Sequence, residues 1–328
     1  MPHIDRRTAS LLGLAALLSP PALAREALAR EAYPTRPVHL IVGFTPGAAS
    51  DVIGRIYANG AGPALGQQVV VENKPGAGSS IAAQYVARAA NDGYTLFVPA
   101  LSTLTNEIVN PAPSFDMSKD FAPIALLANL AIVLVVNPTT DVHSVAELVT
   151  LAKAKPGQVF YASVGAGSLP HLCAALFAQR AGLDLVHVPY PGSPQAITDV
   201  IAGRITMFFA PASGVVGQIA SGKVTALATA ADKRPSALPD VPTMAEAGMP
   251  DFDTSLWLGL LAPAGTPRPV IDKLADAARK AMHAPDAVET LRKQGYDPLD
   301  AGPDEFGAFI RSEVVRWSEV ARTAGLKS

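Results

Sequence analysis

The feature that most constrains the fold is an alternation of short apolar runs with amphipathic helical patterns after residue 37. The runs are β-branched or continuously apolar and are bounded by Gly, Pro or Asn, which is typical of buried strands. The first part of the chain is thereby predicted to form strands at residues 38–44, 68–72, 95–99 and 123–127 and helices at 50–65 and 79–90. Such an alternation predicts parallel or mixed sheets that are covered by helices on both faces.

The alternation continues in a second set of segments and changes after residue 254. Strands are predicted at residues 132–137, 159–163, 185–189, 205–209, 224–229 and 255–262, and helices from Ser144, from Ser193 and at 268–282, 286–294 and 304–324. This order fits two α/β lobes joined by a hinge of two crossings, one formed by residues 33–130 plus 255–328 and the other by 131–254. A single large sheet would show a similar alternation.

Composition excludes several classes of protein. The 328 residues are 49% apolar and 16% charged with a net charge of −2, which disfavours disorder and the coating of nucleic acid or an anionic membrane. The 29 prolines and 26 glycines show no repeating period, which argues against a solenoid. With one cysteine, the chain has neither a disulfide framework nor a cysteine-based zinc site, and we expect Cys173 to be a core residue.

Residues 1–24 have the features of an export signal. Two arginines precede an apolar run at residues 11–18, and Ala22-Leu23-Ala24 supplies a cleavage site, although Ala27-Leu28-Ala29 offers a second. The apolar run is far shorter than the ~20 residues that span a bilayer. The arginine pair fits either twin-arginine export or an ordinary positively charged start. Either route predicts a periplasmic protein without a membrane anchor.

Four loops rich in Gly, Ser or Pro each follow a predicted strand and open a helix, at residues 45–50, 101–103, 164–168 and 190–193. Ligands bind at such strand ends in α/β sheets, and the amides at a helix start attract anions. None of the four loops contains Lys or Arg, which favours a carboxylate over a phosphate ester. Any one of these loops alone is equally compatible with an ordinary turn.

Motifs for nucleotides, metals and catalysis are absent or weak. The glycine pair at residues 76–81 lacks the third glycine of a dinucleotide site, and no clustered His and carboxylate pattern indicates a metal, so we expect no cofactor. Ser168 with His171 or Asp51 could serve an exported hydrolase, but no G-x-S-x-G motif is present and we expect no catalytic residue. Arg55 follows Asp51 by four residues, the spacing of an ion pair on a helix.

Many ordered segments of the chain resemble the periplasmic receptors of tripartite tricarboxylate transporters, also called Bug receptors. The first half of the chain carries the resemblance at residues 33–37, 42–51, 71–78, 91–96 and 119–123. Further along the chain, the resemblance continues at 152–157, at Val188-Pro189-Tyr190-Pro191-Gly192-Ser193 and at 238–248. Because the matches cover essentially the whole chain after the signal, they are far more specific than any single loop.

The resemblance implies a type II periplasmic-binding-protein fold, with two α/β lobes and an organic anion held between them. It further implies a monomeric receptor that delivers a small organic carboxylate to membrane transporter subunits, and a ligand sensor with the same fold is the alternative. The family's ligand-binding positions correspond here to Phe44, Gly47, Ala48, Ala49, Ser50, Asp51, Ser102, Thr103, Ser163, Gly165, Ser168, His171, Tyr190, Gly192 and Ala210.

Several residues depart from the family pattern. Gly43, Thr45 and Ala48 alter the usual Pro-Phe-x-Pro-Gly-Gly segment. Pro191 stands where the family usually has Lys, and Ala210 stands where many members have an Asp that pairs with an amino group. We therefore expect a mono- or dicarboxylate, with an aliphatic or an aromatic body, to bind in preference to aspartate or citrate, and Ala210→Asp to favour amino acids.

Overall fold

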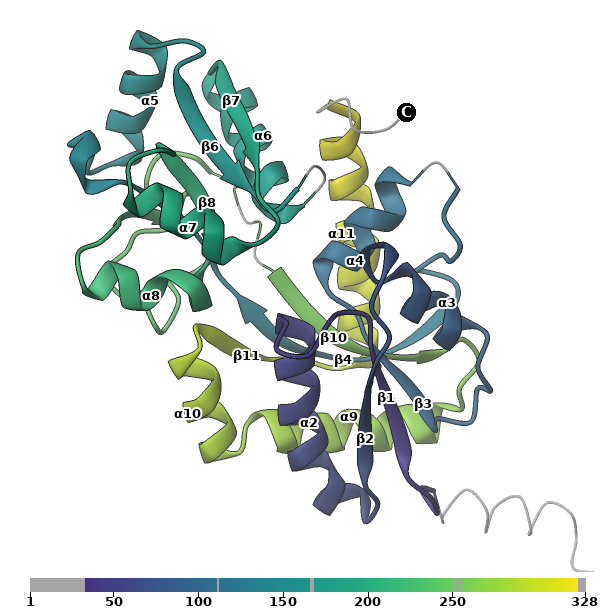
Figure 1. Cartoon of the computed structure of the whole chain (residues 1–328). Helices are drawn as coiled ribbons and strands as arrows, with labels where there is room; N and C mark the ends of the chain where they lie inside the picture. Colours follow the sequence, from purple (N-terminus) through teal and green to yellow (C-terminus); the bar gives the residue numbers. More distant parts are fainter. Residues whose placement is uncertain are drawn as a thin grey trace, which may run out of the picture.

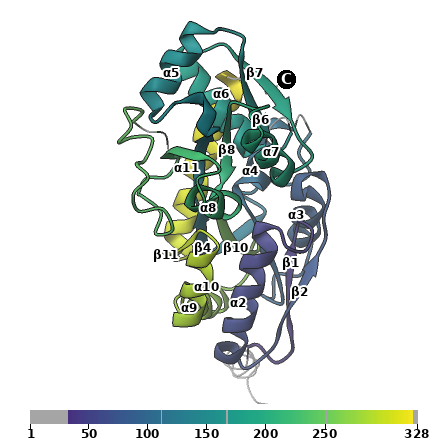
Figure 2. The ribbon, with the colours of Figure 1, turned by 60° about the vertical axis from the view of Figure 1, so that its left-hand side comes forward.

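The computed structural model describes residues 33–110, 112–165, 168–250, 252, 254 and 256–323. The expected export signal and both expected cleavage sites lie outside the described residues. The described part of the chain forms two sheets with helices on both faces of each, as Figure 1 shows. Figure 2 shows the same two bodies one above the other. We call the sheet with the amino-terminal strand, together with its helices, the first lobe, and the other sheet with its helices the second lobe.

The sheet of the first lobe contains six strands in the order β11-β4-β10-β3-β1-β2. Strands β1, β2 and β3 are parallel, whereas β10, β4 and β11 join them in antiparallel pairs, so the sheet is mixed. The strands are β1 (Val38–Val42), β2 (Val69–Asn73), β3 (Thr95–Val98), β4 (Phe121–Leu130), β10 (Leu256–Pro263) and β11 (Tyr296–Ala301).

The sheet of the second lobe contains five strands in the order β7-β6-β8-β5-β9. The β6 pairs are parallel and the β5 pairs are antiparallel, so this sheet is mixed as well. The strands are β5 (Ile132–Val136), β6 (Val159–Ser163), β7 (Leu185–Pro189), β8 (Met207–Pro211) and β9 (Thr225–Thr229).

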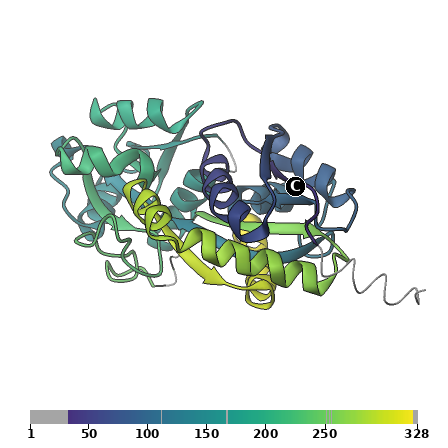
Figure 3. The same ribbon diagram turned by 90° about the horizontal axis from the view of Figure 1, so that it is seen from below.

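The helices of the described chain are α2 (Ala49–Leu65), α3 (Ser80–Ala87), α4 (Leu101–Val109), α5 (Val145–Ala154), α6 (Leu169–Ala181), α7 (Ser193–Ile201), α8 (Ala212–Ala220), α9 (Arg268–Met282), α10 (Pro285–Lys293) and α11 (Pro303–Thr323). Short 3-10 turns lie at η1 (Ala77–Ser79) and η2 (Pro138–Thr140). Helices α2 and α9 pack together along one side of the first lobe, as the view from below shows (Figure 3).

Alternating side chains divide the core into two continuous apolar layers. On β1, Leu40 and Val42 belong to the layer that contains α2 and α9, whereas Ile41 belongs to the layer that contains α3, α4 and α11. On β5, Val133 and Leu134 are divided in the same way between the layer of α7 and α8 and that of α5 and α6. Because successive side chains of a strand point to opposite faces, continuous apolar strands are needed to fill both layers.

The chain crosses between the two sheets in two places. The first crossing is Ala131 alone, since β4 ends at Leu130 and β5 begins at Ile132. The second runs from the end of β9 to the start of β10. The carbonyl of Ala131 accepts a hydrogen bond from the amide of Ala212 at 2.9 Å, which ties the first crossing to the start of α8. No helix among the described residues is long and apolar enough to cross a bilayer.

Candidate functional site

A hollow of about 400 Å³ lies where the strand ends of the two sheets face each other. We call it the central hollow. Its size falls in the lower part of the range of small-molecule sites. Its lining residues come from both lobes: Phe44, Gly78, Ser102, Asn106, Val109, Ile132, Val164, Ser168, Leu169, Pro170, Pro211 and Leu256. Three of these, Phe44, Ser102 and Ser168, were predicted from the sequence.

Helix α4 presents one face to the central hollow. Ser102, Asn106 and Val109 line it at spacings of four and three residues, which place side chains on one side of a helix. The Asn106 Oδ1 atom accepts a hydrogen bond of 3.0 Å from the hydroxyl of Ser80. This bond orients the amide so that Nδ2 is left as a donor. Thr103, in contrast, is fully buried, and its Oγ1 accepts a hydrogen bond from the Ala100 amide.

The carboxylate of Asp51 organises the loop that follows β1. It accepts hydrogen bonds from the Gly47 amide (2.9 Å), from Arg55 Nε (3.0 Å) and from Asn73 Nδ2 (2.9 Å). Asn73 Nδ2 also donates to the carbonyl of Phe44 at 2.9 Å. Burial alone would raise the pKa of Asp51, but the bonds from Arg55, Gly47 and Asn73 outweigh it and hold that pKa below its usual range. The expected ion pair with Arg55 is confirmed, and the network fixes the loop beside the central hollow.

Helix α2 begins without a side-chain cap. Its N-cap residue is Ala48, which has no oxygen to accept a hydrogen bond from the first-turn amides. Within the described residues, the amides of Ala49 and Ser50 donate to no protein acceptor. Gly47 has a φ of +84°, a conformation that glycine adopts without strain. The loop therefore presents two amides that have no partner at the positive end of a helix.

In the second lobe, Ser163 at the end of β6 is tied to His187 on β7. Its Oγ lies 2.6 Å from His187 Nε2, and it also accepts a hydrogen bond of 3.0 Å from the Gly165 amide. The Ser168 hydroxyl donates to the carbonyl of Gly165 at 2.7 Å. These bonds hold Gly165 and Ser168 in place after β6, and Ala166 and Gly167 between them lie outside the described residues.

His171, on the first turn of α6, takes part in a stack of rings. Its ring centroid lies 4.3 Å from that of His187, which in turn stacks on Tyr161 at 5.0 Å. Burial lowers the pKa of both imidazoles, and the neighbouring His187 lowers that of His171 further. Both histidines are thereby favoured in their neutral form.

Of the predicted positions in the second lobe, Ser168 lines the central hollow, whereas Ser163, Gly165, His171, Tyr190, Gly192 and Ala210 do not. Tyr190 donates its hydroxyl to Asp199 at 2.6 Å, and burial together with Asp199 raises the pKa of Tyr190 to about 12. Gly192 is the N-cap of α7. Ala210 is fully buried in β8, and its neighbour Pro211 lines the hollow instead.

Neither Ser163 nor Ser168 is an accessible nucleophile. The close Ser and His pair is Ser163 with His187, which the sequence did not indicate, and Ser163 is fully buried. The proton of the Ser168 hydroxyl is directed to the carbonyl of Gly165. A hydrolytic mechanism needs a nucleophile that substrate can reach and a base that accepts its proton, and neither serine meets both conditions.

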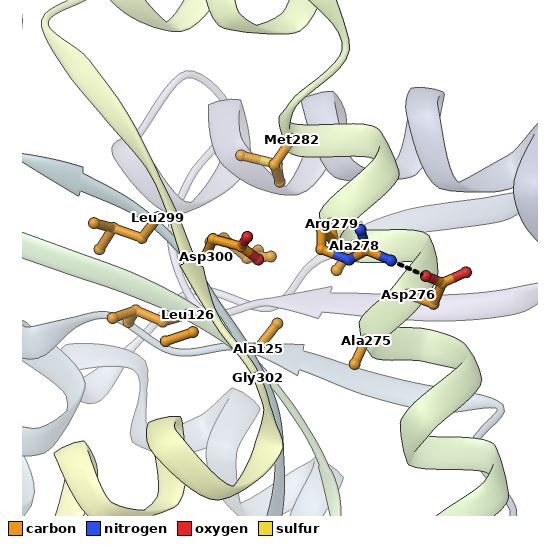
Figure 4. A pocket seen from close by; sticks show the side chains of 12 residues that line it. Ala125, Leu126, Ala275, Asp276, Ala278, Arg279, Met282, Leu299, Asp300 and Gly302 are labelled. Atoms are coloured by element: carbon orange, nitrogen blue, oxygen red, sulfur yellow. Dashed lines mark hydrogen bonds and ion pairs between the residues drawn. The ribbon is translucent and has the colours of Figure 1, made fainter.

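A second hollow, of about 180 Å³, lies in the first lobe between α9 and β11 (Figure 4). Its lining includes Asp276 and Arg279, which form an ion pair with each other, together with apolar side chains such as Met282. All of its lining residues come from the first lobe, so it does not lie between the two sheets.

Comparison with known proteins identifies the family. Residues 53–326 match the family described as "Tripartite tricarboxylate transporter family receptor". The chain belongs to this family. The match covers most of both lobes and confirms the resemblance that the sequence segments indicated.

Solved structures of the family share the architecture. The periplasmic binding protein BugD is 32% identical, with a TM-score of 0.75 over 90% of this chain and 99% of BugD. An R. palustris protein solved with adipate is 32% identical (TM-score 0.77, 89% and 98% of the chains). MatC from Rhodopseudomonas palustris, solved with bound malate, is 31% identical (TM-score 0.74, 88% and 99%). The predicted two-lobed periplasmic-binding-protein fold is confirmed, and the family and its neighbours are substrate-binding proteins.

Proposed function

We propose that this protein is a periplasmic receptor that captures a small organic carboxylate in the central hollow and delivers it to a tripartite tricarboxylate-type membrane transporter. We also propose that it acts as a monomer, with lobes at residues 33–130 plus 255–328 and at 131–254. The observation that carries the proposal is the position of the hollow between two lobes in a chain of this receptor family. A ligand bound there would touch both lobes and could hold them together.

The chemistry of the hollow supports a carboxylate ligand. Ser102 and Asn106 bring neutral hydrogen-bond donors to the lining, and the uncapped start of α2 lies in the loop that carries Phe44. A hydrogen bond from such a donor to a charged ligand contributes about 1.5–3 kcal/mol. Two structural neighbours were solved with adipate and with malate, which are both organic acids.

The proposal is tested by thermal shift with a panel of mono-, di- and tricarboxylates. A ligand present at 100 times its Kd should stabilise the protein by about 2.7 kcal/mol. A flat response to every organic acid would contradict the proposal.

A second experiment separates transport from sensing. The protein is deleted in cells, and both the uptake of the ligand and the induction of genes by the ligand are measured. A receptor for transport is required for uptake, whereas a sensor is required for induction.

A further inference from the structure

The turn η1 has an unusual backbone and forms part of the wall of the central hollow. Ala77, Gly78 and Ser79 have φ angles of +46°, +60° and +77°, so three successive residues are in the left-handed conformation. This conformation is costly for the two residues that have side chains. Strain of this kind persists where the surrounding structure requires it, which is often at a functional site. Gly78 itself lines the hollow, and the turn packs against helix α4.

Gly78 lies directly against the side-chain amide of Asn106. A Cβ atom on Gly78 would lie 2.5 Å from Asn106 Nδ2 and 2.6 Å from Asn106 Cγ. A larger residue at position 78 would therefore displace the amide, whereas glycine lets the turn approach it closely. Since Gly78 and Asn106 both line the hollow, this contact lies at its wall.

Ser80, the first residue of α3, fixes the orientation of the same amide. Its hydroxyl is buried and donates to Asn106 Oδ1 at 3.0 Å. Apolar side chains of α3 and α4 belong to one core layer, which keeps Ser80 within reach of Asn106. With its oxygen held by Ser80, the amide has Nδ2 on the side of Gly78, and among the described residues this nitrogen has no protein acceptor.

The hollow also contains helix starts that favour anions. The amides of Ala49 and Ser50 at the start of α2 have no acceptor among the described residues, and residues 168–170 form the uncapped start of α6. A helix start attracts negative charge in general. A side-chain amide, in contrast, presents one donor and one acceptor at defined positions. The helix starts thus add affinity for anions, whereas Asn106 can distinguish an acceptor from a donor at one point of the ligand.

We infer that η1 together with Ser80 is a specificity element of the central hollow, which holds Asn106 Nδ2 as a donor to an oxygen of the bound acid. Asn106 contacts the ligand, and Gly78 and Ser80 are positioning residues. The inference rests on the proposed function. It adds a segment, residues 77–80, that lies outside the four loops in which the sequence predicted ligand binding.

The first test removes the donor and keeps the acceptor. Asn106→Asp retains an oxygen for Ser80 but replaces the amide nitrogen by a second oxygen. Calorimetry is carried out with benzoate, malate, adipate and citrate at pH 8. Each acid that binds the wild-type protein should lose about 30-fold in affinity, because a hydrogen bond to a charged group is replaced by repulsion between like charges. Asn110→Asp is the matched control, since Asn110 is exposed at the end of the same helix, and it should change the affinity less than about threefold.

The pH dependence separates a missing donor from a damaged fold. The introduced carboxyl group can donate a hydrogen bond once it is protonated. The loss caused by Asn106→Asp, measured against the wild-type protein, should therefore shrink by about threefold between pH 8 and pH 5. A constant loss, an equal loss in Asn110→Asp, or normal binding by a folded Asn106→Asp variant would overturn this inference and leave the proposed receptor function standing. No binding of any of the four acids to the wild-type protein would overturn both.

The second test is a double-mutant cycle on Ser80. Ser80→Ala frees the amide of Asn106 to turn, so the affinity for the acid that binds most tightly of the four should fall about fivefold. In an Asn106→Ala background, Ser80→Ala should leave the affinity unchanged, because no amide remains to be oriented. An equal loss in both backgrounds, or no loss in the wild-type background, would show that Ser80 does not act through Asn106 and would overturn the specificity element.

Discussion

Gly43 and Ser79 form a close contact that a double-mutant cycle can measure. A Cβ atom on Gly43 would lie 1.7 Å from the Ser79 Oγ and 2.9 Å from the Ser79 Cα. Gly43→Ala must therefore displace the turn that contains Ser79, and overpacking of this kind costs about 1–3 kcal/mol. The fully extended β1 and the helix α3 hold the two backbones in place, so we expect a loss of about 3 kcal/mol in the free energy of unfolding.

Ser79→Gly should have the opposite effect. Ser79 has a φ of +77°, which costs a residue with a side chain about 1–2 kcal/mol. Among the described residues, its hydroxyl is buried without a hydrogen-bond partner, which costs about 1–3 kcal/mol more. Glycine loses about 0.5–1 kcal/mol through its greater freedom in the unfolded chain. The net gain should be about 1–4 kcal/mol, and in the double variant Ser79→Gly should recover at least about 2 kcal/mol of the Gly43→Ala loss.

The assay is urea unfolding followed by tryptophan fluorescence. The two tryptophans of the chain, Trp257 and Trp317, are both buried in the first lobe, which also contains Gly43 and Ser79, so the signal reports the relevant lobe. The denaturant slope should stay constant across the four proteins, which keeps the comparison valid. Two results would refute the reasoning: Gly43→Ala with wild-type stability, or effects of the two substitutions that simply add.

Three further predictions concern binding and pH. In calorimetry, Gly47→Val should weaken the binding of an organic acid more than Ser102→Ala does. Valine is strained at a φ of +84°, so the loop after β1 must move, whereas Ser102→Ala removes one hydrogen-bond donor and should lower the affinity about tenfold. Similar losses of affinity in the two variants would contradict this. The melting temperature should fall as the pH drops below about 6.5, because His171 and His187 have lowered pKa values in the folded protein and therefore bind protons more readily in the unfolded chain. His187→Phe should flatten this dependence of the melting temperature on pH. His283→Gln, at an exposed position, should leave it unchanged. Aspartate and glutamate should give no thermal shift, because no described lining residue is charged and could pair with an ammonium group.

Local sequence pattern predicted most of the elements. The limits of β6, β7 and α9 agree with the prediction at both ends, because each is a clear apolar run or amphipathic stretch between breakers. Strand β4 is longer than predicted, since Pro123 was taken as its boundary, but the strand continues to Phe121 and contains register shifts against β10. Strand β11 was not predicted. Its sequence is polar and contains Pro298, and only its pairing with β4 at the sheet edge makes it a strand.

The parts of the site that lie at strand ends could be predicted from the sequence. The parts that depend on how helices and strands pack together could not. The loops after β1 and β6 were identified because glycine, serine and proline follow apolar runs. Asn106 was missed because it lies inside a helix, although its spacing of four residues from Ser102 was a usable signal. Ser163 with His187 could not be found, since the two are brought together by the pairing of β6 with β7.

The strand order of the first lobe has a consequence for biosynthesis. Strand β10 lies between β3 and β4, so the two amino-terminal portions of this sheet are joined only after residue 256 has been made. The second lobe, in contrast, takes all five strands from one continuous stretch, Ile132–Thr229. The emerging chain can therefore complete the second lobe while β3 and β4 still expose unpaired edges that invite aggregation. Refolding should accordingly be slow in the first lobe, and chains that end before β10 should depend on chaperones to stay in solution.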